Sequence, residues 1–283
     1  MASVGDFVVT LDGEVVAADH PVACGDDPLF GRGDGVFETV LIRGGRARLL
    51  GEHLDRMARS ATNVGLPPPE RTRWQAAALT AAAECSGDEA VLRLVFGRRS
   101  DGGATGFLTV STLPARVPAA RRDGVSAMTL DRGVSGYDLR TAPWSIAATK
   151  SLSYALNAAA LHHARNLGID DVVLLSTDGL ILEGPRSNVV VVDEQGALVT
   201  PPASLPILAG TTVKAVFETA RSQGRHCREA PLRVADLHTA QGVWLLSSVT
   251  LAARVHTLDG VPLAVDPGVL HMASLVAAAI GGP

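Results

Sequence analysis

The sequence contains only two lysines, Lys150 and Lys214, among its 25 lysine and arginine residues. Arginine therefore supplies nearly every other cationic side chain. A guanidinium is essentially never deprotonated in a protein, whereas a lysine amine can lose its proton and attack a carbonyl to form a Schiff base. Apolar residues at helical spacing follow Lys150, which predicts that it stands at a helix entrance. An ordinary surface lysine is the alternative, but scarcity and position favour a reactive amine.

Blocks of like charge and long apolar runs are also missing. The formal net charge is -4 and no basic cluster occurs, which gives no support for nucleic acid or a membrane surface as a partner. No apolar run approaches the length of a membrane span. Residues 1–12 lack a cationic start and an apolar segment, which predicts that there is no secretory signal peptide.

Cysteines and aromatic residues are scarce. The three cysteines, Cys24, Cys85 and Cys227, are scattered and lack metal-ligand spacing, which predicts thiols of a cytoplasmic protein and no metal site. Aromatic residues make up 4% of a chain that is 47% hydrophobic. The core is therefore expected to consist mainly of alanine, valine and leucine.

The predicted elements mix strands and helices without a regular alternation. Strand patterns occur at residues 7–10, 14–16, 36–42, 47–50, 91–96, 106–112, 172–175, 180–183, 189–192 and 243–246, and helical patterns at 52–64, 70–85, from Lys150 to Gly168, at 210–222 and at 269–280. We therefore expect an α+β fold of two domains. The predicted boundaries are a small N-terminal domain over 1–115, a linker over 116–123 and a large domain over 124–283.

Glycines punctuate the stretch Phe30-Gly31-Arg32-Gly33-Asp34-Gly35. A phosphate-binding loop should follow a strand and open a helix, but these glycines precede the strand predicted at 36–42. We infer that they allow the backbone to approach another segment closely.

Two features suit anion binding. Gly210-Thr211-Thr212 opens a predicted helix, and helix N-termini with hydroxyl side chains bind anions readily. Arg56 lies beside the apolar face formed by Leu54 and Met57 in the helix predicted at 52–64. Spacing alone favours a solvated arginine at this position.

Seven segments, in order, resemble the fold-type IV pyridoxal-phosphate enzymes, which include branched-chain aminotransferases, D-amino-acid transaminases and aminodeoxychorismate lyases. The segments are residues 33–39, 53–57, 150–154, 182–188, 200–202, 207–212 and 246–248. Each is short, but their shared order and spacing extend over nearly the whole chain. The resemblance implies a small N-terminal α/β domain, a larger β-barrel-like domain with flanking helices, and a homodimer.

The resemblance also implies a pyridoxal 5'-phosphate cofactor and roles for individual residues. Lys150 would carry the cofactor as a Schiff base and act as general base and acid. Glu183 would keep the pyridine nitrogen protonated, and Tyr154 would lie beside the ring oxygen. The phosphate group would be held by Arg56, Thr211, Thr212 and Ser248. The remaining expected cofactor contacts are Ser187, Asn188 and Ser247.

The family divides into lyases and transaminases that share the cofactor. Lys150-Ser151-Leu152-Ser153-Tyr154 is close to the Lys-x-Leu-Asn-Tyr form of the lyase branch, and residues 247–255 lack the Glu-Ile-Thr-Pro pattern of many aminotransferases. We therefore expect aminodeoxychorismate lyase, which releases pyruvate and forms 4-aminobenzoate for folate biosynthesis. A D-amino-acid or branched-chain transaminase, and a relative without catalytic activity, are the alternatives.

The substrate of the lyase carries two carboxylates, so its site needs cations beyond those at the phosphate. Because lysine is nearly absent, arginines are expected to supply them. Arg98, after the strand at 91–96, is the first candidate and Arg186 the second. Phe37 is expected at the substrate as well.

Overall fold

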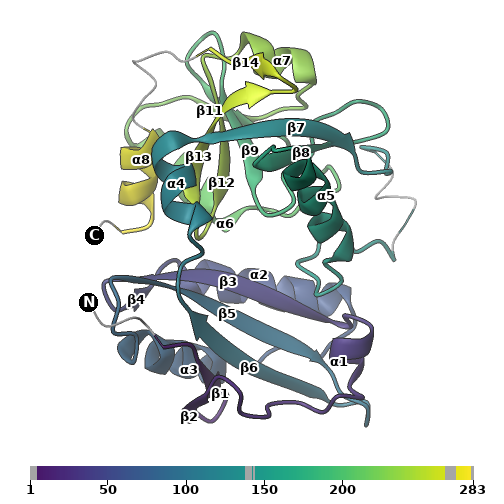
Figure 1. Ribbon diagram of the computed structural model, residues 1–283, viewed down its shortest axis with the longest axis vertical. Helices are drawn as coiled ribbons and strands as arrows, with labels where there is room; N and C mark the ends of the chain where they lie inside the picture. The colour runs from purple at the N-terminus through teal and green to yellow at the C-terminus, as the bar shows by residue number, and fades with distance from the viewer. Residues whose placement is uncertain (1–4, 138–141, 143, 265–271, 282–283) are drawn as a thin grey trace. The chain divides into compact units, whose positions relative to one another are not determined.

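The computed structural model describes residues 5–137, 142, 144–264 and 272–281. Contacts divide the chain into two compact units (Figure 1): unit 1 takes residues up to Pro114 together with Thr149–Tyr154, and unit 2 takes Ala115–Ala148 and the residues from Ala155 onward. The chain thus enters unit 1 twice. The segment around Lys150, expected in the large domain, belongs to unit 1, because it pairs with a strand of that unit.

Unit 1 is an antiparallel sheet with two helices on one face. Its strands run in the order β2-β1-β6-β5-β3-β4, and all the pairings are antiparallel. The elements are β1 (Phe7–Thr10), β2 (Val15–Ala17), α1 (Pro28–Gly31), β3 (Gly35–Arg43), β4 (Arg46–Ala47), α2 (Leu50–Asn63), α3 (Arg71–Ala83), β5 (Glu89–Arg98) and β6 (Ala104–Ser111). The hairpin predicted at 7–16 is confirmed. The strand predicted at 47–50 is wrong beyond Ala47, because Leu49 adopts a φ of 52° and α2 begins at Leu50.

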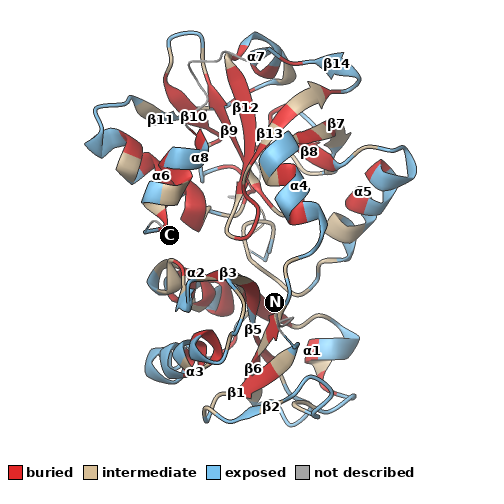
Figure 2. Cartoon of the chain, turned by 60° about the vertical axis from the view of Figure 1, so that its left-hand side comes forward, coloured by how far each residue is buried: buried red, intermediate tan, exposed pale blue. Residues whose placement is uncertain are grey.

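The core of unit 1 explains why the sheet binds these helices. Alternate residues of β3, including Val36 and Val40, face Met57 of α2 and Trp74 of α3, and all four are buried. Alternation along a strand sends every second side chain to the same face. Figure 2 shows that buried residues concentrate on the strands and on the helix faces that meet them.

Unit 2 contains a mixed sheet and five helices among its described residues. The strand order is β11-β10-β9-β12-β13-β7-β8, with β14 beside β13. The elements are α4 (Arg116–Asp123), β7 (Val125–Asp131), α5 (Ala155–Asn166), β8 (Asp171–Leu175), β9 (Asn188–Val192), β10 (Leu198–Thr200), α6 (Thr211–Ser222), β11 (Cys227–Glu229), α7 (Val234–Thr239), β12 (Gly242–Ser247), β13 (Leu251–Leu258), β14 (Val261–Pro262) and α8 (Met272–Ala279). In this part of the chain the hydrogen-bonded order has two ends, β11 and β8, and no pairing joins them.

Three predictions for unit 2 need correction: the linker at 116–123, the strand at 180–183 and the start of the helix that follows Lys150. Residues 116–123 form α4 instead of a linker, because Val117 and Ala120 are buried and Pro118 lies in the first turn, where its missing amide costs no helical hydrogen bond. Residues 180–183 do not form a continuous strand. Ile181 forms an isolated bridge to Leu175 of β8, and the Leu182 amide donates to the Leu174 carbonyl at 2.9 Å, while the Ile181 amide donates to the Leu232 carbonyl on the other side at 2.7 Å.

The helix expected at Lys150 begins five residues later. Lys150 lies in an extended segment, and α5 starts at Ala155. Tyr154 therefore precedes the helix instead of lying on it. The helix ends as expected near Gly168, whose φ is 74°.

The helix predicted at 269–280 is described from Met272, and residues 269–271 lie outside the described residues. None of the helices in the described residues is long and apolar enough to cross a membrane.

Candidate functional site

The Lys150 segment is held on the edge of β3. The Phe37 amide donates to the Lys150 carbonyl at 3.0 Å, and the Leu152 amide donates to the Gly35 carbonyl at 2.9 Å. Val36 and Ser151 form an antiparallel bridge between these bonds. Segments more than a hundred residues apart thus become neighbouring strands, which fixes the backbone of Lys150.

The glycines before β3 allow this approach. A Cβ on Gly33 would lie 3.0 Å from the Ser153 amide nitrogen, and a Cβ on Gly35 would lie 2.7 Å from a methyl group of Leu152. Gly33 also has a φ of 62°, which a residue with a side chain rarely adopts. The prediction that these glycines permit close approach of another segment is confirmed, and that segment is the one that carries Lys150.

The Phe37 ring lies beside the Lys150 amine and packs against Tyr154. The Lys150 Nζ lies 4.5 Å from the centroid of the Phe37 ring. The Tyr154 ring meets the same ring edge-on, with centroids 5.7 Å apart. The Lys150 amide donates to Ser60 Oγ of α2 at 3.3 Å. These contacts fix the backbone of Lys150 and place its amine beside the Phe37 ring.

Glu38, His53 and Arg56 form a buried ionic cluster in unit 1. Glu38 accepts hydrogen bonds from Arg56 Nε at 2.7 Å and from Arg56 Nη2 at 2.8 Å. His53 Nδ1 lies 2.7 Å from Glu38 Oε2. All three residues are buried, so the expectation of a solvated Arg56 is wrong. Arg56 reaches the interior because a carboxylate on the apolar face of β3 compensates its charge.

Burial and charge set the ionisation of this cluster. Burial alone would raise the pKa of the Glu38 carboxyl, but Arg56 and then His53 outweigh it and hold that pKa far below its ordinary value. Burial lowers the pKa of His53, with smaller contributions from Arg56 and Lys150, although Glu38 opposes this shift. Because an ionised carboxylate only accepts, the Nδ1–H of His53 must donate to Glu38.

A second group forms in unit 2 around Glu183, which is buried. Its Oε2 accepts from the Leu208 amide at 3.1 Å, and its Oε1 lies 3.3 Å from Arg132 Nη1. Arg132 also donates to the Pro206 carbonyl at 2.6 Å and to the Ala147 carbonyl at 3.1 Å. Glu183 is thus a buried carboxylate held by one backbone amide and one guanidinium.

Asn188 connects Glu183 to the start of α6. Its Nδ2 donates to the Leu208 carbonyl at 2.8 Å, and its Oδ1 packs against Gly210, the residue before α6. Thr211 and Thr212 follow in the first turn and are buried. Gly210 has no side chain that could cap this helix, and anion binding at its first turn stays a prediction.

Ser248 follows β12, whose Leu246 pairs with Asn188. The predicted residues Glu183, Asn188, Thr211, Thr212 and Ser248 therefore lie on adjoining elements of unit 2.

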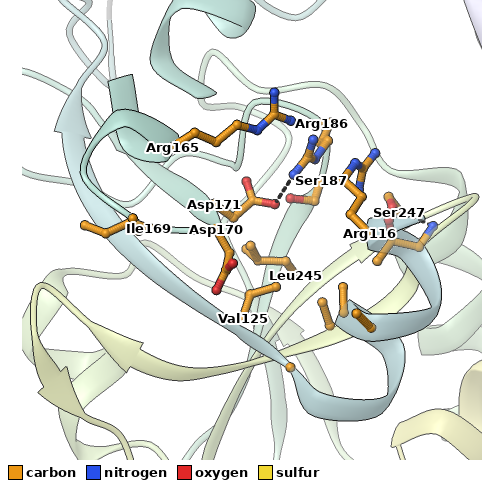
Figure 3. A pocket seen from close by; sticks show the side chains of 16 residues that line it. Arg116, Val125, Arg165, Ile169, Asp170, Asp171, Arg186, Ser187, Leu245 and Ser247 are labelled. Carbon is orange, nitrogen blue, oxygen red and sulfur yellow. Dashed lines mark hydrogen bonds and ion pairs between the residues drawn. The ribbon is translucent and has the colours of Figure 1, made fainter. Parts of the chain in front are cut away.

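Two other predicted residues face elsewhere. Ser187 and Ser247 line a cavity of about 330 Å³ within unit 2, on the side occupied by α4 and the end of α5. Figure 3 shows Arg116, Arg165 and Arg186 along one side of this cavity. Arg186 donates to Asp171 at 3.0 Å. Glu183 and Asn188 do not line it, so Ser187 and Ser247 are not grouped with them.

Arg98, the expected substrate residue, is engaged within unit 1. Its Nε donates to Asp34 at 3.0 Å, and its Nη2 donates to the carbonyls of Val64 and Gly65 at 3.1 and 3.3 Å. These contacts tie the loop before β3 to the end of α2. Its role at the substrate stays a prediction.

Sequence reasoning missed Glu38, His53 and Arg132. Glu38 stands at an inward position of β3, and His53 and Arg56 are three residues apart on α2, a spacing that puts two side chains on one helix face. This combination could have indicated a buried polar group. Arg132 gave no such signal, because it meets its carboxylate partner 51 positions away.

Comparisons with known proteins agree with this arrangement. The family model described as Amino-transferase class IV matches residues 35–258. A Mycobacterium tuberculosis protein named bifunctional aminodeoxychorismate lyase / D-amino acid transaminase is 50% identical, over 97% of this chain and 99% of its own length. A putative branched-chain-amino-acid aminotransferase from Methanocaldococcus jannaschii is 29% identical over 90% of this chain and 86% of its own.

Solved structures give the same result. A hypothetical aminotransferase from Mycobacterium tuberculosis in a PLP-bound form superposes with a TM-score of 0.94 at 50% identity, covering 97% of this chain and 99% of that one. A fold IV transaminase from Curtobacterium pusillum gives a TM-score of 0.88 at 35% identity, with 97% of both chains covered. The two-domain α+β fold is confirmed, and the chain belongs to the class IV aminotransferase family of fold-type IV pyridoxal-phosphate enzymes.

Proposed function

We propose that this chain is a pyridoxal-phosphate-dependent 4-amino-4-deoxychorismate lyase, which releases pyruvate and forms 4-aminobenzoate for folate biosynthesis. The observation that carries the proposal is the seating of Lys150, whose backbone is paired to β3 and whose amine lies against Phe37. The Mycobacterium tuberculosis relative, 50% identical over 97% of this chain, has this lyase activity in its name. That name supports the choice of reaction within the family.

The described residues fit the cofactor. Pyridoxal phosphate presents an aldehyde, a ring oxygen, a pyridine nitrogen and a phosphate group. Lys150 offers a primary amine for the aldehyde. Tyr154, against Phe37, offers a hydroxyl for the ring oxygen. The buried carboxylate of Glu183 suits a protonated pyridine nitrogen, because each charge favours the other.

The phosphate has suitable partners as well. Arg56 supplies a guanidinium that makes charge-assisted contacts to phosphate oxygens. Thr211 and Thr212 supply hydroxyls and amides at the start of α6, where the helix dipole favours an anion. We assign Ser248 to the same group. When bound, the cofactor supplies an electron-withdrawing ring that stabilises negative charge on the substrate carbon.

Lys150 then moves the proton. In our proposal its amine takes the proton from the substrate carbon that bears the amino group and later returns a proton. Phe37, which packs against Tyr154, restricts where the amine can reach. Lyase and transaminase differ in where this proton goes and in what leaves, so Lys150 serves both reactions.

A D-amino-acid transaminase activity is the second candidate. The name of the same relative includes this activity, and a solved structure of a hypothetical aminotransferase from Mycobacterium tuberculosis is described as an α-ketoglutarate- and PMP-bound form. A D-alanine aminotransferase from Bacillus licheniformis is 27% identical over 81% of this chain. We infer that both activities belong to this chain and that the lyase is the main one.

A paired assay tests the proposal. The purified protein is given aminodeoxychorismate, and 4-aminobenzoate is measured. In parallel, keto-acid formation is measured from a panel of D- and L-amino acids. We expect 4-aminobenzoate at the higher turnover and keto acid from D-amino acids. Keto acid from branched L-amino acids without any 4-aminobenzoate would overturn the lyase proposal. A colourless protein that does not take up the cofactor would overturn both.

We also propose a homodimer in the cytoplasm. The resemblance supports the dimer, and the three unpaired cysteines suit a reducing compartment. Sedimentation of the loaded enzyme tests the assembly. A monomer with full cofactor and full activity would contradict it.

A further inference from the structure

The buried cluster in unit 1 places a carboxylate where the apolar face of a strand would be expected to carry an aliphatic side chain. Glu38 lies between Val36 and Val40 on the inward face of β3, and its side chain is fully buried. Desolvating two charges removes much of what their attraction gains, so a buried ion pair is often no more stabilising than a packed hydrophobic pair. Stability of the fold alone is therefore a poor reason for this arrangement.

Its geometry gives a better reason. A guanidinium can bind an oxyanion in a bidentate manner along two edges: the side edge made by Nε and one Nη, and the end edge made by both Nη atoms. Glu38 accepts along the side edge of Arg56, from Nε and Nη2. The end edge shares Nη2 with this contact and points in another direction within the guanidinium plane. Rotation of the guanidinium about its own axis would break one of two short bonds.

His53 fixes the carboxylate in turn. It lies 2.7 Å from Oε2, the same oxygen that accepts from Arg56 Nη2. The ring is buried and comes from the same helix as Arg56, one turn earlier. Glu38 thus has three bonds to two residues of α2, and its plane and that of Arg56 are set together.

We propose that Glu38 and His53 are positioning residues that orient Arg56 toward the phosphate group of the cofactor. This inference rests on the proposed function, in which Arg56 binds that phosphate.

The inference predicts the sign of an effect. Glu38 carries a negative charge beside Arg56, so charge alone says that neutralising Glu38 would strengthen the binding of a phosphate dianion. The effect on orientation is the opposite: without the second short bond the guanidinium can turn and lose its bidentate contact with phosphate, which weakens phosphate binding. The proposal requires that orientation dominates.

The experiment uses apoenzyme of the full chain and follows cofactor absorbance during titration. Glu38→Gln keeps the size and one acceptor oxygen but removes the charge. We expect its dissociation constant for pyridoxal phosphate to rise by roughly tenfold or more, the effect of one charge-assisted hydrogen bond. Pyridoxal, which lacks the phosphate, should bind the variant and the parent within about twofold. A merely structural defect would weaken both ligands.

Two further comparisons separate the possible failures. Arg56→Lys keeps the charge but cannot bind in a bidentate manner, so it should weaken pyridoxal phosphate by a similar factor. In the Arg56→Lys background, Glu38→Gln should add little. Unchanged phosphate affinity in Arg56→Lys would overturn the proposed role of Arg56. A loss in Arg56→Lys together with unchanged or tighter binding in Glu38→Gln would overturn the positioning role alone.

Glu89→Gln is the matched control, because Glu89 also pairs with an arginine, Arg43, across β3 and β5. It should leave both affinities unchanged. If Glu38→Gln does not fold, His53 provides the test. His53→Asn can still donate to Glu38 and should retain phosphate affinity, whereas His53→Phe should lose it selectively. Equal affinities in these two variants would overturn the proposal.

Discussion

Each unit pairs an arginine with a buried carboxylate, but the two pairs are built differently. Arg56 meets Glu38 through two bonds of 2.7 and 2.8 Å. Arg132 meets Glu183 through one contact of 3.3 Å, and the other oxygen of Glu183 accepts from a backbone amide. In unit 1 the carboxylate fixes the direction of the arginine. In unit 2 the arginine supplies charge while the backbone fixes the carboxylate. The same two residue types thus hold a cation in position in unit 1, where it is Arg56, and an anion in position in unit 2, where it is Glu183.

Lys150 is the proposed catalytic residue, and its loss should have the largest effect. Lys150→Ala should lower turnover by about 10²- to 10⁴-fold, the usual contribution of a positioned acid–base group. Borohydride reduction and peptide mapping of the parent should place the pyridoxyl group on Lys150. Lys214→Ala is the matched control, because Lys214 is exposed on α6. A label on Lys214 would contradict the assignment.

Removing the arginine should lower the free energy of unfolding more in the first pair than in the second. Arg56→Ala leaves Glu38 buried without its main cation, so the free energy of unfolding should fall by about 3–5 kcal/mol. Spacing alone favoured a solvated arginine, whose removal would affect folding little, and the burial of Arg56 corrects that view. Arg132→Ala should cost about 1–3 kcal/mol, because the Leu208 amide still donates to Glu183. Denaturant unfolding measures both, and equal losses would refute the contrast.

Catalysis should depend on the second pair through Glu183. Glu183→Gln should lower turnover by about 10²-fold, because the pyridine nitrogen loses its ionic partner. Arg132→Met should lower it by roughly tenfold, the effect of one weakened charge contact. Steady-state kinetics at saturating cofactor compares the two. If Arg132→Met proves as harmful as Glu183→Gln, the backbone amide does not hold the carboxylate.

The free energy of unfolding should depend on acidic pH through Glu38 and His53 in unit 1. The pKa of Glu38 is held below its ordinary value of 4.5 by Arg56 and His53 against the effect of burial, and burial lowers the pKa of His53 from its ordinary 6.5. For both groups the folded state binds fewer protons than the unfolded state. The free energy of unfolding should therefore fall below about pH 6.5 through His53, and further below about pH 4.5 through Glu38.

Unfolding midpoints from neutral to acidic pH test this. His53→Asn should remove the first part of the decline. An unchanged slope in that variant would show that another histidine is responsible.

Arg98→Ala should have the smallest effect on stability. Its pair with Asp34 is about one-third exposed, so it should contribute less than about 1 kcal/mol. If Arg98 binds a substrate carboxylate, the Michaelis constant for aminodeoxychorismate should rise while the spectrum of the bound cofactor stays the same. Full lyase efficiency in the variant would remove Arg98 from the substrate site.

The parts of the site that sequence predicted are those with a local signal. Lys150 was singled out by scarcity, and Gly33 and Gly35 by their position before a strand. Glu38 and Arg132 were missed, because a strand or helix pattern treats a charged side chain as solvent-facing unless its partner is known. That partner is fixed by tertiary packing: Glu38 meets Arg56 across 18 positions, and Arg132 meets the Pro206 carbonyl across 74.

The edge pairing between Lys150 and β3 has a consequence for biosynthesis. Unit 1 closes this edge with residues 149–154, which are translated after the first 34 residues of unit 2. Until they leave the ribosome, the backbone of Gly35 to Phe37 presents unpaired groups that can associate with other chains. Because domains begin to fold during synthesis, most of unit 1 is free to form before its lysine arrives. The segment that carries Lys150 is thus the last strand added to the first unit, and a nascent chain that ends before Thr149 lacks this lysine and leaves this edge of β3 unpaired.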